Sequence, residues 1–114
     1  MTLKELVETY ELQVVTGADS LDREVSGCYA SDLLSDVMGN SGGGDLWITL
    51  QVHQNIVAVA SMRELAGVVM IGGRQPLEAT IEKAAEEGVP LLTTALSAFE
   101  LCGRLYEGGL RGRS

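Results

Sequence analysis

Hydrophobic and polar positions alternate in repeated blocks along the second half of the chain. Three times, a short apolar run leads through a polar or glycine-rich turn into a stretch with helical periodicity. The apolar runs are residues 46–50, 68–73 and 89–93, and the helical stretches are residues 55–63, 76–87 and 97–107. Because this alternation is typical of a parallel or mixed sheet covered by helices, it predicts an α/β fold with any ligand site at the carboxyl ends of the strands.

The first half of the chain predicts further elements of the same kind. Thr2 and Glu5 form a capping box, the signature of a helix start, and an apolar stripe that includes Leu3 and Leu6 follows it. Apolar segments over residues 12–16 and 24–30 predict two more strands, and residues 32–38 predict a short helix. The pattern therefore predicts one three-layer α/β/α domain over residues 1–110, around a mixed, largely parallel sheet of about five strands.

The last predicted helix starts with a second capping box, formed by Ser97 and Glu100. Its apolar positions predict an inner face with the following members: Phe99, Cys102, Leu105 and Tyr106. Beyond it, residues 111–114 are predicted to form a short basic tail. Arg111 and Arg113 of this tail, together with Arg104, are expected to be solvated rather than to form a binding surface.

Composition restricts the core and the compartment. Hydrophobic residues make up 46% of the chain and aromatic residues only 4%, so the core must be mainly aliphatic. No apolar stretch approaches the length of a membrane span. The N-terminus has no positive region followed by an apolar block, so we expect no signal peptide and a cytoplasmic protein.

The charge balance and the cysteines exclude further classes of protein. Sixteen acidic and eight basic residues give a net charge of −8, which would repel a nucleic-acid backbone. Cys28 and Cys102 both fall in apolar segments, where free cysteines usually act as small hydrophobic residues. Two thiols are too few to hold an iron–sulfur cluster within one chain. We therefore expect no nucleic acid, no membrane and no cofactor.

Polar residues follow the apolar run at 46–50 and form the first half of a candidate ligand site. Thr49, Gln51, His53 and Asn55 lie between the end of a strand and the start of a helix, where backbone N–H groups can bind an anion or a carbonyl. The alternative is that these residues only cap the helix and meet solvent. Histidine is the usual general base near neutral pH, and His53 is the sole histidine, so it is also a candidate base.

The second half of the candidate site is Gly72, Gly73 and Arg74, at the end of the next strand. Paired glycines allow close approach of the backbone to a ligand, and the guanidinium can pair with an anion. The alternative is a tight turn with an exposed arginine. The spacing fits neither a P-loop nor a dinucleotide fingerprint. Asp32 and Asp36, four residues apart in a predicted helix, share a face that could bind a cation or simply be solvated.

The order of several segments resembles the DRTGG domain family. The segments that carry the resemblance are residues 44–49, residues 68–73 with Pro76, residues 12–17, residues 21–25 and residues 90–92. The family is similar in fold to the N-terminal domain of HPr kinase/phosphorylase. It occurs beside CBS modules, in some phosphotransacetylases, and as small free-standing proteins, some encoded near components of iron-only hydrogenases. The resemblance implies a regulatory or ligand-sensing role without established catalysis.

This chain departs from the family pattern at the positions that give the family its name. Val52 and His53 replace an aspartate and an arginine, and Ile71 replaces a threonine, whereas the glycines at 72 and 73 are kept. Residues 53–60 look like those of the free-standing subgroup. The departures leave open whether this chain binds a different ligand or none.

Together these features predict a non-catalytic regulatory domain that binds a small, anionic metabolite and alters contacts with a partner protein. The resemblance implies a hydrogenase or related redox system as the partner. A homodimer is expected, because so small a sheet leaves apolar edges to cover. Two alternatives stay open: a small transferase or hydrolase that uses His53 as a base, and a structural adaptor without a ligand.

Overall fold

A computed structural model describes residues 1–112, which form five strands, five α-helices and one short 3-10 helix. In chain order these are α1 (Leu3–Tyr10), β1 (Gln13–Thr16), η1 (Ala18–Ser20), β2 (Gly27–Ala30), α2 (Leu34–Asn40), β3 (Asp45–Thr49), α3 (Asn55–Met62), β4 (Gly67–Met70), α4 (Glu78–Glu87), β5 (Leu91–Thr93) and α5 (Ala98–Glu107). None of the helices within this range is both long enough and apolar enough to cross a bilayer. Arg113 of the predicted tail lies outside the described residues.

The strands form a single sheet in the order β1-β5-β4-β3-β2. Strands β2 to β5 are mutually parallel, and β1 pairs antiparallel with β5. The predicted mixed, largely parallel sheet of about five strands is therefore confirmed. Successive parallel strands are neighbours, so from β2 to β5 the chain winds across the sheet in one direction.

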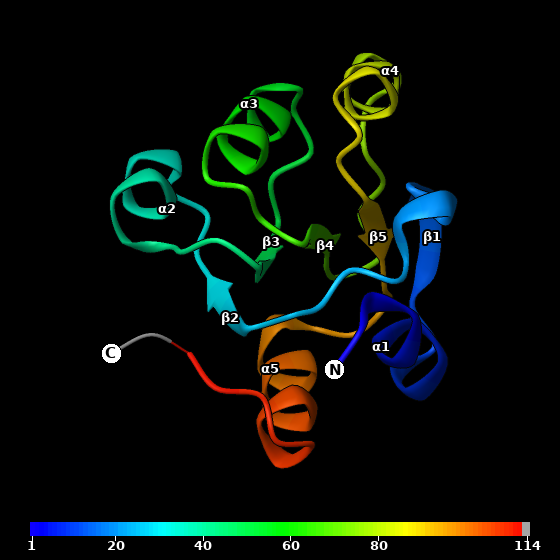
Figure 1. Ribbon diagram of the computed structural model, residues 1–114, viewed down its shortest axis with the longest axis vertical. Helices are drawn as coiled ribbons and strands as arrows, with labels where there is room; N and C mark the ends of the chain where they lie inside the picture. The colour runs from blue at the N-terminus through cyan, green and yellow to red at the C-terminus, as the bar shows by residue number, and fades with distance from the viewer. Residues whose placement is uncertain (113–114) are drawn as a thin grey trace.

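The helices form two outer layers (Figure 1). Because crossovers between parallel strands are right-handed, winding in one direction puts α2, α3 and α4 on the same face of the sheet. Helix α5 leaves β5 toward the opposite face, where α1 also lies. This arrangement confirms the predicted three layers, and it sends the helices after β4 and β5 to opposite sides.

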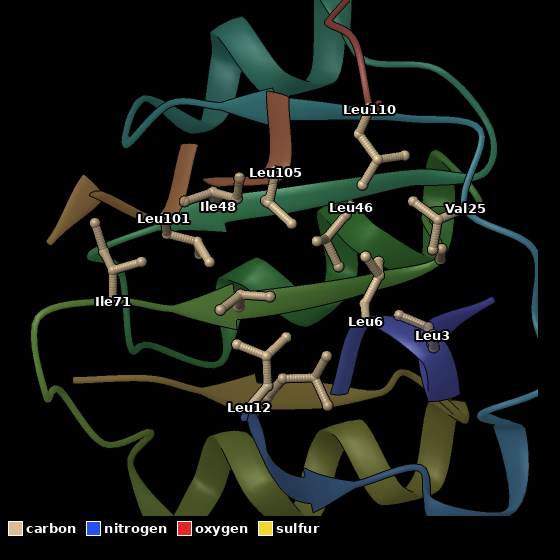
Figure 2. Close-up of a cluster of buried hydrophobic side chains, with 13 residues drawn as sticks. Leu3, Leu6, Leu12, Val25, Leu46, Ile48, Ile71, Leu101, Leu105 and Leu110 are labelled. Atoms are coloured by element: carbon tan, nitrogen blue, oxygen red, sulfur yellow. The ribbon is translucent and has the colours of Figure 1, made fainter. Parts of the chain in front are cut away.

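Alternate residues of each strand supply two cores, one per face, as the pleat of a strand requires. On β3, Leu46 and Ile48 pack with α1 and α5, whereas Trp47 packs beneath α2 and α3. Figure 2 shows the first of these clusters, in which leucines of α1 and α5 meet the sheet. Every residue of β3 and of β4 is buried, which explains why their sequences read as continuous apolar runs.

The first helix starts as predicted, but the inner face of α5 is partly different. Thr2 and Glu5 form the complete capping box at the start of α1. In α5, Leu101 and Leu105 are the buried residues. The predictions for Phe99 and Tyr106 are wrong, because their side chains are 86% and 60% exposed. The helix is rotated so that the two leucines, one turn apart, face the sheet.

Leu110 and the two residues after it lie against the edge strand β2. The backbone N–H of Cys28 donates to the carbonyl oxygen of Arg111 at 3.0 Å, and Cys28 and Gly112 form a parallel bridge. The Arg111 guanidinium stacks 3.8 Å from the centre of the Tyr106 ring and donates to the Tyr106 carbonyl oxygen. The expected solvated tail is thus attached to the fold at its first two residues.

The carboxylate of Asp36 gives the protein a pH-dependent contact on α2. Hydrogen bonds from Ser31, Tyr29 and Asn40 hold the pKa of Asp36 below its ordinary value. A depressed pKa in the folded state means that the ionised group favours folding above its unfolded-state pKa, and that this contribution is lost as the pH falls through the folded-state pKa. We expect Asp36→Asn to flatten the loss of stability between about pH 5 and pH 2.

The test is urea unfolding of both proteins across that pH range. Asp22→Asn, in an exposed turn outside this network, is the matched control. If the free energy of unfolding falls equally with pH in the wild type and in Asp36→Asn, the role given to this carboxylate is contradicted.

Candidate functional site

The predicted residues at the end of β3 tie this strand to the loop before α2. The Thr49 hydroxyl and the Leu50 N–H both donate to Oδ1 of Asp32, at 2.8 and 2.7 Å, and the Gln51 amide donates to the Asp32 carbonyl oxygen at 2.9 Å. Thr49 is only 1% exposed. The prediction that Asp32 and Asp36 share a helix face is wrong, because α2 begins after Asp32 and its carboxylate turns to β3 instead.

The paired glycines connect the loops that follow β4 and β5. Their φ angles are +66° and +73°, which glycine adopts without steric cost. The Gly72 N–H donates to the Leu96 carbonyl oxygen at 2.7 Å, and the Gly73 N–H donates to the Thr94 carbonyl oxygen at 3.0 Å. Both N–H groups are therefore engaged within the protein, and the glycines set the shape of this edge.

The remaining predicted side chains stand at the same edge of the sheet. His53 and Asn55 follow β3, Arg74 follows β4, and these two strands are parallel neighbours. The structure thus brings the two predicted halves to one rim, as expected from a parallel sheet. All three side chains are exposed, and their role in binding stays a prediction.

A pocket of about 400 Å³ opens beside Gly73, at the carboxyl ends of β4 and β5. Its position follows from the topology: the chain leaves β4 toward α4 on one face and leaves β5 toward α5 on the other (Figure 1). Loops that diverge to opposite faces leave a crevice between two strand ends, which is where open α/β sheets bind ligands. The lining residues are Tyr10, Glu11, Gln13, Gly73, Gln75, Thr93, Thr94, Ala95, Leu96 and Arg104.

The pocket is polar and has one basic side chain. Arg104 lies on α5, its side chain is 56% exposed, and its Nε is 3.9 Å from the Glu100 carboxylate, which makes a weak surface ion pair. The amides of Gln13 and Gln75 add donors and acceptors. Such a set can hold a molecule with one anionic group and further polar atoms. Glu11 also lines the pocket, so its carboxylate limits the negative charge that a ligand can carry.

Of the predicted ligand residues, Gly73 lines this pocket. The other predicted residues follow two consecutive strands, whereas the pocket joins segments that come from α1, β1, two loops and α5. The sequence pattern groups Arg104 with Arg111 and Arg113 instead. To predict that Arg104 lines the pocket, one must know that α4 and α5 pack on opposite faces of the sheet, and no local sequence pattern gives that information. Among residues 1–112, no three His, Cys, Asp or Glu side chains are grouped as a metal site would require.

No protein-family model matches the chain, and no curated protein matches it by sequence. Its fold is similar to the crystal structure of the CBS and DRTGG domains of the regulatory region of Clostridium perfringens pyrophosphatase, complexed with the activator diadenosine tetraphosphate. The TM-score is 0.67 and the sequence identity is 16%. The likeness covers 96% of this chain and 47% of the other, so this protein spans about half of that structure. At this identity the likeness supports the fold, which is of the DRTGG-like kind that the sequence predicted.

Proposed function

We propose that this protein is a regulatory domain that binds a small anionic metabolite in the pocket at the ends of β4 and β5. The observation that carries the proposal is the position of Arg104 in a polar pocket between diverging loops. A regulatory role is also consistent with the fold's likeness to the regulatory region of a pyrophosphatase that was crystallised with a nucleotide activator. Occupation of the pocket would alter the contacts of its loops with a partner protein.

The charges of the protein define the class of ligand. A guanidinium forms charge-assisted hydrogen bonds with phosphate or carboxylate oxygens, whereas the net charge of −8 repels anions elsewhere on the surface. Binding should therefore depend on one local contact and weaken with added salt. Because Glu11 also lines the pocket, a ligand with a single anionic group and otherwise neutral polar groups fits best.

A thermal-shift screen with ATP, diadenosine tetraphosphate and acetyl phosphate tests whether such ligands bind. A ligand at a hundred times its dissociation constant should stabilise the protein by about 2.7 kcal/mol. For a probe that binds, Arg104→Gln should raise the Kd about tenfold or more, since a hydrogen bond to a charged group contributes about 1.5–3 kcal/mol. Calorimetry of the wild type and the variant measures this change.

Arg74→Gln is the matched control, because Arg74 lies at the same rim but does not line the pocket. We expect this variant to bind like the wild type. The reverse result, with binding lost in Arg74→Gln and kept in Arg104→Gln, would move the site to the residues predicted from the sequence. No stabilisation by any of the three probes would contradict the proposal and favour an adaptor without a ligand.

Catalysis has a separate test. If the protein turns over one of the probes and His53→Ala loses that activity, the protein is an enzyme that uses this histidine as a base, and the binding role is wrong.

The partners are tested in two further experiments. Sedimentation tests the expected homodimer, and a pull-down from native cell extract tests for a partner protein. The hydrogenase system stays a prediction from the family resemblance.

A further inference from the structure

We infer that a second pocket, between β2, α5 and residues 110–112, binds a small uncharged apolar molecule. Its volume is about 260 Å³. Ile48 comes from β3, Cys102 and Leu105 from α5, and Leu110 from the segment after α5. Figure 2 shows Ile48, Leu105 and Leu110 together at one end of the buried cluster. This apolar pocket shares no lining residue with the polar pocket at β4 and β5.

The two thiols of the protein lie in the wall of this pocket. Burial, followed by the charges of Cys102 and Asp45, raises the pKa of the Cys28 thiol to about 12. Burial also raises the pKa of Cys102. Both groups are therefore neutral thiols at physiological pH and extend the apolar wall, rather than acting as nucleophiles, which need the thiolate.

The charged lining residue, Arg111, is held by contacts within the protein. Its Nη1 donates to the carbonyl oxygens of Tyr106 and Leu110, at 2.7 and 2.9 Å, and its guanidinium covers the Tyr106 ring. Its carbonyl oxygen accepts from the Cys28 N–H, which fixes this wall to β2. An uncharged ligand leaves these contacts intact, whereas an anionic one would have to lose its hydration in a pocket whose other lining residues carry no charge.

The size of the pocket sets the size of the ligand. A dry protein cavity of about 150 Å³ is known to hold benzene. A pocket of 260 Å³ therefore has room for a bicyclic aromatic ring such as indole, or for a short aliphatic chain. Concave sites lined mainly by apolar side chains are the usual location of small-molecule binding, which is why we assign a ligand here rather than an empty space.

The test is an NMR titration of the full, uniformly ¹⁵N-labelled chain with indole, and with indole-3-acetate as the charged analogue. Indole should shift the amide signals of Cys28, Ile48 and Leu105 and leave those of Gly73 and Thr94 unchanged. Indole-3-acetate should bind this pocket about tenfold more weakly or not at all. Because ATP is expected to act on Gly73 and Thr94, failure of this inference and failure of the proposed function give different spectra.

Three substitutions keep the test specific. Ala30→Leu, at an exposed position on the pocket wall, and Cys102→Met, at a half-buried one, should each weaken indole binding about tenfold by filling the space. Cys102→Ser keeps the room and should bind indole nearly as well as the wild type. Unchanged indole affinity in Ala30→Leu, or no shift of the pocket amides up to the solubility limit of indole, would overturn the inference.

Discussion

Replacing Trp47 with alanine is expected to lower the free energy of unfolding by about 3–5 kcal/mol. Trp47 is fully buried in the middle of β3, and its indole N–H donates to the Ser31 carbonyl oxygen at 2.8 Å. The substitution leaves a large cavity under α2 and α3 and removes a hydrogen bond that connects β3 to the end of β2. Denaturant unfolding followed by circular dichroism measures the loss.

Phe99→Ala is the control for this experiment. It also removes an aromatic ring, but from a side chain that is 86% exposed on α5, and its effect should stay within about 0.5 kcal/mol. Equal losses in the two variants would contradict the arrangement of the two helical layers. They would instead favour the inner face that the sequence predicted for the last helix.

Gly17→Ala is expected to have the next largest effect. Gly17 has a φ of +86°, and an added Cβ would lie 2.7 Å from the Pro90 Cα, a backbone atom that cannot move aside. The left-handed conformation costs an alanine about 1–2 kcal/mol, and the forced displacement adds about 1–3 kcal/mol. The neighbouring Thr16 hydroxyl donates to the Val89 carbonyl oxygen and accepts from the Leu91 N–H. A displacement at Gly17 should disturb both hydrogen bonds and therefore weaken the pairing of β1 with β5.

Gly88→Ala separates the two contributions. Gly88 ends α4 with a φ of +70°, but an added Cβ would have no neighbour within 4 Å. This variant should therefore show only the conformational cost, about 1–2 kcal/mol, and the excess loss in Gly17→Ala measures the contact with Pro90. If both variants lose the same stability in urea unfolding, β1 and the start of β5 are not packed as closely as described.

The sequence predicted the α/β class because β3, β4 and β5 are short, fully buried and followed by helices. The capping box at Thr2 placed α1 correctly because its hydrogen bonds are local. The phase of α5 could not be predicted in the same way. Phe99, Cys102 and Tyr106 recur at helical spacing as regularly as Leu101 and Leu105. Only the tertiary packing decides that the two leucines are buried, that Cys102 is half-buried and that the two aromatic rings are exposed.

The candidate site was predicted only in part, for a topological reason. A parallel sheet brings His53 and Arg74 to one rim, and the sequence is sufficient for that inference. The pocket itself depends on the opposite faces taken by α4 and α5, and it brings Arg104 close to Gly73. Thr49 also belonged to the predicted site, yet its partner Asp32 comes from another loop, and no local pattern signals their contact.

The pairing of the first strand with the last has a consequence for biosynthesis. Strand β1 finds its place beside β5, so it must wait until most of the chain has left the ribosome. The parallel strands between them can assemble earlier, one strand–helix unit after another. Because closing the long loop between β1 and β5 is slow, the pairing of β1 should be a late step in folding. Until then the edge of β5 lacks its partner strand and is exposed to wrong pairing.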